Sequence, residues 1–189
     1  MQTPFRSLHS PRCITGCSLA GVFMGSLALL APAQQPPPMS AEVQREAMHK
    51  LAFLAGRWSG QATIPRGAGE PLHLTQSEDV EYKLDGLVLL IEGKSCSADG
   101  KEQFSALATI AYDDGARTYH IRAYNAGRYV DAELDVHSDG FAWSFPAGPA
   151  RIVNTMHLND KGEWQEVTNV TVGNTPARRS VEMLLQRLR

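Results

Sequence analysis

From Arg57 to the C-terminus, hydrophobic residues recur at every second position, and this two-residue period most constrains the fold. A period of two is typical of β-strands, because successive side chains point to opposite faces. The alternating runs are short and are separated by turn sequences that favour tight hairpins. These turns include Asp85-Gly86, Asp99-Gly100, Asp114-Gly115 and Asp139-Gly140. The pattern is typical of an up-and-down barrel or a sandwich, and we predict an all-β fold with a single antiparallel up-and-down β-barrel of about ten strands.

One helix is predicted, and it precedes the first strand. Ser40 is a good N-cap, and Gly56 supplies a stop signal. Between them, apolar residues recur at helical spacing, at Val43, Ala47, Met48, Leu51 and Leu54. The last segment, Ser180–Arg189, has a pattern compatible with either a strand or a helix. We assign a strand, because the first strand of the barrel needs a closing partner.

The N-terminus has the composition of a signal peptide. Arg6 and Arg12 precede an almost wholly apolar run over residues 13–30, and Ala31-Pro32-Ala33 forms an A-x-A cleavage site. We therefore predict a signal peptide at residues 1–33, a Pro-rich linker at residues 34–40 and a lipocalin-like β-barrel domain at residues 41–189. The alternative is an uncleaved anchor, since about 18 apolar residues can span a membrane. Cleavage is favoured by three glycines within the run and by the small residues that follow it.

Charge and cysteine content restrict the partners of the mature domain. Removal of the leader takes the formal net charge from −2 to −4, because the leader carries two arginines and no acidic residue. This mildly acidic balance predicts no nucleic-acid partner and no stable membrane association after cleavage. The mature chain keeps only Cys96, so no internal disulfide is expected despite a periplasmic or secreted destination.

The segment before the first strand resembles a known family. Residues 51–58 place Gly56-Arg57-Trp58 directly after the predicted helix, and Leu84-Asp85-Gly86 and Ala111-Tyr112-Asp113 follow in the β-region. These features resemble the lipocalin and wider calycin barrels, in particular bacterial lipocalin-like domains of unknown function and, more loosely, nitrobindin-type barrels. The resemblance covers roughly residues 48–189 and implies that Trp58 plugs the closed end of a barrel.

Nitrobindin-type barrels bind haem through a histidine, which makes the histidines of this chain relevant. Strand parity predicts that His120 and His157 face solvent, and no histidine matches the haem ligand of the family. We therefore predict no cofactor. We also predict no metal site and no catalytic residue, because zinc-site spacing and nucleophile motifs are absent from the mature sequence.

Polar residues on otherwise apolar inward faces are the most informative functional signal. Gln76 and Glu78 share a strand face with Leu74 and Tyr82. Asn154 and Glu166 stand in similar positions on two later strands. Buried polar groups need hydrogen-bond partners. One interpretation is that these side chains line a cavity. The alternatives are that these parts of the strands lie at the rim of the barrel, or that a β-bulge reverses which residues face inward. The apolar wall of such a cavity would come from Trp58, Tyr82, Phe104, Trp143, Met156 and Trp164.

The sequence thus favours an exported barrel that binds a small, largely apolar molecule. An enzyme that works inside the cavity, with haem or with a carboxylate acid–base pair, is the alternative. A third hypothesis is a solid barrel that acts as an interaction module or homodimer.

Export generates the first prediction. N-terminal sequencing of the protein recovered from the periplasm or medium of its host is expected to begin at Gln34, because the leader carries the basic, apolar and small-residue regions in order. Ile14-Thr15-Gly16-Cys17 resembles a bacterial lipobox, but Cys17 lies at the start of the apolar run rather than after it, so no lipid is expected there. An intact Met1, or a lipid on Cys17, would contradict this prediction.

Overall fold

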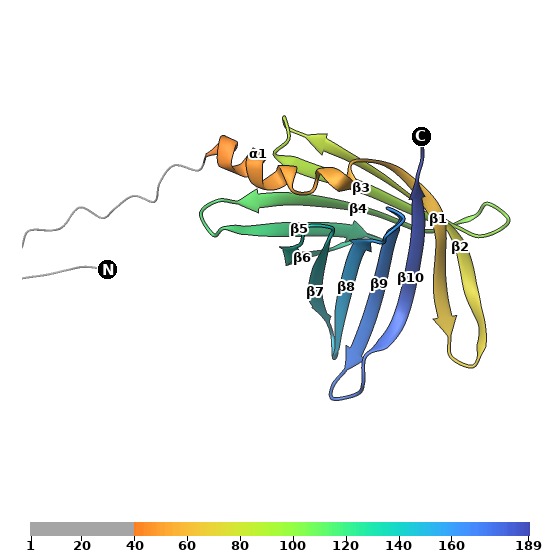
Figure 1. The fold of residues 1–189 in the computed structure, drawn as a ribbon. Helices are drawn as coiled ribbons and strands as arrows, with labels where there is room; N and C mark the ends of the chain where they lie inside the picture. Colours follow the sequence, from red (N-terminus) through yellow and green to blue (C-terminus); the bar gives the residue numbers. More distant parts are fainter. Residues whose placement is uncertain (1–39) are drawn as a thin grey trace, which may run out of the picture. The chain divides into compact units, whose positions relative to one another are not determined.

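The computed structural model describes residues 40–189, so the predicted signal peptide and nearly all of the predicted linker lie outside the described residues. One helix, one short 3₁₀ helix and ten strands follow in chain order (Figure 1). They are α1 (Ala41–His49), η1 (Ala52–Leu54), β1 (Gly56–Arg66), β2 (Gly69–Lys83), β3 (Val88–Cys96), β4 (Glu102–Asp113), β5 (Thr118–Asn125), β6 (Arg128–Val136), β7 (Gly140–Ala147), β8 (Ala150–Leu158), β9 (Trp164–Val172) and β10 (Arg178–Arg187).

The ten strands form a closed antiparallel barrel with up-and-down topology, which confirms the predicted fold class. Each strand pairs with its neighbours in sequence, and β1 pairs with β10 to close the cylinder. The C-terminal segment is therefore a strand, as predicted from the need for a closing partner. The turns β1–β2, β3–β4, β5–β6, β7–β8 and β9–β10 all lie at one end of this barrel, and α1 lies across the other end (Figure 1).

Helix α1 closes one end because the barrel binds both of its termini. The Ser40 side chain caps the helix by accepting a hydrogen bond from Val43, as predicted. The Ser40 amide donates to Asp114, in the β4–β5 turn, at 2.6 Å. At the other terminus, the hydroxyls of Tyr82 and Tyr119 donate to helix carbonyls at 2.6 and 2.7 Å. The Asp114 bond satisfies an amide at the start of the helix, whereas the tyrosine hydroxyls add a second partner to the Met48 and Ala47 carbonyls, which already accept from Leu51 and Lys50.

The predicted helix boundaries need one correction. Helix α1 ends at His49, and η1 carries the chain to the first strand. Gly56 does not stop the helix but begins β1, with a φ of +127° that favours glycine. The helical spacing was nevertheless informative, because Met48, Leu51 and Leu54 are all fully buried in the core.

Trp58 is the centre of the closed end. Its side chain is 1% exposed, and its indole Nε1 donates to the Leu54 carbonyl at 2.8 Å. The Trp164 ring meets it edge-on, with centroids 5.6 Å apart. The Arg187 guanidinium lies over the Trp58 ring, 4.1 Å from its centroid, and donates to the carbonyls of Phe53 and Ala55. One tryptophan thus joins η1, β9 and β10.

Two irregular places in the wall involve proline. The β6–β7 ladder has three register pairs near its turn, whereas Arg128–Glu133 of β6 has no β7 partner. Pro146 lies in the part of β7 beyond this ladder, where no amide is needed for it. Pro65 and Pro71 lie within β1 and β2, and the register shifts beside Pro65.

Within residues 40–189, no helix is long and apolar enough to cross a membrane.

The packing of Trp58 gives the second prediction. Trp58→Ala is expected to lower the free energy of unfolding by about 3–5 kcal/mol, because it empties a large, fully buried site. Urea denaturation measures the change. Leu184→Ala on β10 is the control, since Leu184 is 44% exposed, and it should cost about 0.5 kcal/mol. Equal effects of the two variants would show that Trp58 does not hold the closed end together.

Candidate functional site

The open half of the barrel holds a cavity of about 520 Å³. Side chains from all ten strands line it, and most of them are apolar or aromatic. Its wall includes Ala62, Ile64, Leu74, Ile91, Ala106, Ala108, Ile121, Ala123, Val130, Phe141, Phe145, Ile152, Val181 and Met183. The barrel is therefore hollow at one end and packed at the other.

Polar side chains form the floor of this cavity, next to the packed closed end. On β2, Gln76 and Glu78 precede Val80, which belongs to the core. Gln76 is 2% exposed and Glu78 is 8% exposed. The amide Nε2 of Gln76 donates to Glu78 Oε1 at 2.6 Å, and the hydroxyl of Ser95 on β3 donates to Gln76 Oε1. Ser95, Gln76 and Glu78 thus make a continuous hydrogen-bonded chain across two strands.

A second set of polar groups comes from β8 and β9. The indole Nε1 of Trp164 donates to Glu166 Oε2 at 2.9 Å. The hydroxyl of Thr168 donates to Asn154 Oδ1 at 2.7 Å. Asn154 is 6% exposed, and Glu166 is half-buried in the cavity wall. Across residues 40–189, no fully buried side-chain nitrogen or oxygen is left without a partner.

Both glutamates are difficult to ionise in this position. Burial, together with the charge of Glu166, raises the pKa of Glu78 to about 8, and the Gln76 hydrogen bond opposes this shift. Burial raises the pKa of Glu166 to about 7, and the Trp164 hydrogen bond opposes it. Near neutral pH the floor therefore holds Glu78 mainly as a neutral acid, which can donate as well as accept a hydrogen bond.

Gly93 makes room for the Glu78 carboxyl. It pairs with Glu78 across the β2–β3 ladder. A Cβ atom at position 93 would lie 2.7 and 2.8 Å from the two carboxyl oxygens. A glycine in the middle of a strand lowers β-propensity, so its presence here is explained by the close approach of the carboxyl group.

The structure brings together most of the residues predicted to line a cavity. Those that line it are Gln76, Glu78, Phe104, Trp143, Asn154, Trp164 and Glu166. The other three lie deeper, in the closed end: Trp58 and Met156 are 1% exposed, and Tyr82 packs against the core while its hydroxyl binds the Met48 carbonyl. Sequence parity missed Ser95 and Gly93, which have the inward parity but small side chains.

The histidines lie away from the cavity. None of the described residues that line it is a histidine. His120 is exposed on β5, and His73 is exposed and contacts Thr63 at 3.2 Å. The donor set of the cavity therefore does not fit a histidine-ligated haem. Within residues 40–189, no group of three or more His, Cys, Asp or Glu side chains is placed to hold a metal ion.

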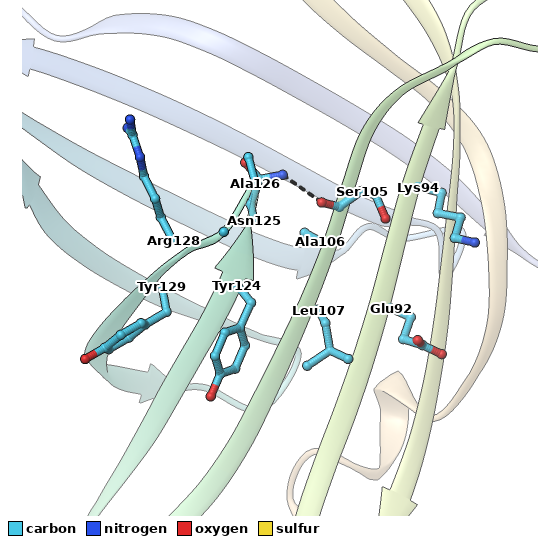
Figure 2. A pocket seen from close by; sticks show the side chains of 11 residues that line it. Glu92, Lys94, Ser105, Ala106, Leu107, Tyr124, Asn125, Ala126, Arg128 and Tyr129 are labelled. Atoms are coloured by element: carbon cyan, nitrogen blue, oxygen red, sulfur yellow. Dashed lines mark hydrogen bonds between the residues drawn. The ribbon is translucent and has the colours of Figure 1, made fainter.

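A surface depression of about 580 Å³ lies near the β5–β6 turn and shares part of its lining with the inner cavity (Figure 2). Figure 2 shows Leu107 and Glu92 on neighbouring strands beside Tyr124, and the hydrogen bond from Asn125 to the Ser105 carbonyl. Tyr124 is 40% exposed, and Tyr129 is 61% exposed. This depression is open to solvent, whereas the inner cavity encloses its polar groups, so the inner cavity is the stronger candidate site.

Comparison with known proteins places the fold in a recognised class. No family model matches the chain, and no curated protein sequence matches it. Among solved structures, the chain is similar to Rv2717c from M. tuberculosis, with a TM-score of 0.57 and 14% identity over 76% of this chain and 98% of that one. It is also similar to the S-type phycobiliprotein lyase CPES from Guillardia theta, with a TM-score of 0.52 and 11% identity over 80% of this chain and 94% of that one.

These likenesses concern the fold, because the sequence identities are low. The two neighbours are calycin-like β-barrels, and this chain shares their fold as a closed ten-strand barrel. The looser resemblance to nitrobindin-type barrels stays a prediction.

The raised pKa values of the two floor carboxyls give the third prediction. Both groups ionise near pH 4.5 when unfolded, but near pH 8 and 7 in the folded barrel. Between these values the folded state holds more protons, so its stability falls as the pH rises, by up to about 1.4 kcal/mol per pH unit for each carboxyl. Urea denaturation from pH 5 to 8 measures the slope.

Two variants test whether Glu78 causes this pH dependence of stability. Glu78→Gln is expected to flatten it, because the amide does not titrate and no longer repels Glu166. Asp79→Asn changes the adjacent, exposed residue of β2 and should keep the wild-type slope. An unchanged slope in Glu78→Gln would mean that Glu78 is ionised in the folded protein.

Proposed function

We propose that the protein is an exported barrel that binds a small, largely apolar molecule in its inner cavity. The observation that carries the proposal is an apolar cavity of about 520 Å³ with a polar floor. Ligand sites are typically mostly apolar clefts in which a few placed polar groups fix the orientation of the ligand. The ligand would place its apolar body against Trp143 and Phe145, whose rings stack at 5.2 Å, and its polar end toward Glu78 and Glu166.

Two further considerations support the proposal. One structural neighbour is a phycobiliprotein lyase, and the shared fold is consistent with small-ligand binding in a barrel of this kind. Fold alone does not decide function, so the cavity is the main support. The export part of the proposal rests on the leader sequence, and N-terminal sequencing tests it separately.

The fourth prediction tests the cavity with N-phenyl-1-naphthylamine, a neutral dye that fluoresces in apolar surroundings. The dye is expected to bind saturably to the wild-type protein. Ala123→Trp should weaken binding by about tenfold or more, because Ala123 lines the cavity and the larger ring fills it. The measurement is a fluorescence titration, with unfolding temperatures recorded for each variant.

His120→Trp is the matched control. It adds the same ring to the same strand, but His120 is exposed and lies outside the cavity lining. Its dye affinity should equal that of the wild type. Loss of binding in both variants, or in neither, would refute binding inside the barrel.

The two floor carboxyls also favour a second candidate function, acid–base catalysis on the bound molecule. Carboxyl groups with raised and different pKa values are typical of general acids and bases. Native mass spectrometry of protein purified from its host would identify the co-purified molecule. If the wild type converts this molecule, whereas Glu78→Gln binds it without converting it, the protein is an enzyme. Recovery of the molecule unchanged from the wild type supports the binding function.

A further inference from the structure

The cavity has an unequal distribution of charged groups. The ionisable side chains that line it are Glu78, Glu166, Tyr124, Arg128 and Tyr129. The two tyrosines and Arg128 flank the β5–β6 turn at the open end and are exposed. The floor therefore holds two carboxyl groups and, within residues 40–189, no basic side chain.

Each floor carboxyl receives one hydrogen bond from the protein and has one oxygen left. Gln76 donates to Glu78 Oε1, and Trp164 donates to Glu166 Oε2. In the described part of the chain, no hydrogen bond reaches Glu78 Oε2 or Glu166 Oε1. Because no fully buried side-chain oxygen of the described residues lacks a partner, these two oxygens are accessible, and both glutamates line the cavity. The protein thus supplies donors that suit ionised carboxyls but no cation to neutralise them.

A ligand can supply that cation. An ammonium group has three donors and no acceptor, which matches two unpartnered carboxyl oxygens at the end of an apolar cavity. A buried charge is tolerated when it is paired and hydrogen-bonded. We propose that the ligand class is an apolar primary or secondary amine, whose protonated nitrogen binds between Glu78 and Glu166 on the cavity floor. This inference rests on the proposed binding function.

The same floor could also bind a neutral ligand. As neutral acids, Glu78 and Glu166 would donate to a carbonyl or hydroxyl oxygen, and binding would then be strongest at low pH. An amine requires ionised carboxyls, so its binding should strengthen as the pH rises and should release protons from the floor. The two ligand classes therefore differ in the sign of their pH dependence.

Displacement of N-phenyl-1-naphthylamine by eight-carbon ligands separates these possibilities in the wild-type protein. Octylamine, octan-1-ol and octanoate have the same chain length and differ in their polar ends. At pH 7.5, octylamine is expected to displace the dye at about a tenfold lower concentration than octan-1-ol, because it gains hydrogen bonds between charged groups. Octanoate should be the weakest, because it adds a third carboxylate.

The pH profile and the variants complete the test. Octylamine affinity should rise between pH 5.5 and 8, and calorimetry in two buffers of different ionisation enthalpy should detect proton release. The double variant Glu78→Gln, Glu166→Gln should bind the dye but lose the preference for octylamine over octan-1-ol. Asp79→Asn, whose side chain lies outside the cavity lining, should keep that preference.

The outcomes distinguish this inference from the proposed function. Saturable dye binding without a preference for octylamine would overturn the amine assignment and leave the binding function intact. If the double variant still prefers octylamine over octan-1-ol, the amine binds elsewhere, and the amine assignment is overturned. Failure of the wild type to bind the dye or any of the three ligands would overturn both. If the double variant does not fold, the ligand series and pH profile of the wild type decide.

Discussion

The packed closed end, built around Trp58, is the constraint on which the rest of the structure depends. Its indole is bonded to the Leu54 carbonyl, edge-on to Trp164 and covered by Arg187. Arg187 lies near the end of β10 and Trp58 near the start of β1, and the two residues are register partners at the seam that closes the cylinder. The same contacts that seal one end of the barrel therefore also hold its first and last strands together. Because this end is filled, the open half does not need to be packed for the barrel to be stable.

The polar floor lies where the packed half meets the hollow half, and its hydrogen bonds explain how the fold tolerates it. A buried amide or carboxyl without a partner would cost about 1–3 kcal/mol. Here Gln76 bonds Ser95 and Glu78, while Trp164 bonds Glu166, so each side chain is held in one orientation. The bonds are made between strands or along one strand. Each carboxyl keeps one oxygen without a hydrogen bond from the described residues, so the floor is not a closed internal network.

The sequence predicts the face of each residue much better than its depth. A two-residue period placed Gln76, Glu78 and Asn154 on inward faces, and the structure agrees. The same period gave Trp58, Tyr82 and Met156 an inward face without showing that they lie below the floor. Depth depends on the stagger of neighbouring strands and on the position of the helix, which are long-range properties. Small residues such as Gly93 carry no hydrophobic signal, so their part in the site emerges only from the pairing with Glu78.

Barrels of this class share a fold at identities of 14% and 11%, so the fold itself requires few particular residues. Trp58 and the helix meet a packing requirement that hydrophobic residues can satisfy. The floor is different, because leucine or valine at positions 78 and 166 would fill part of the cavity and remove the desolvation cost of two carboxyls. Gly93 adds to this argument, since a mid-strand glycine weakens β2–β3 packing and its benefit is the space for the Glu78 carboxyl. Three positions thus depart from what stability alone favours. Those at 78 and 93 together place the Glu78 carboxyl at the bottom of the cavity, which is where the specificity of the barrel should reside.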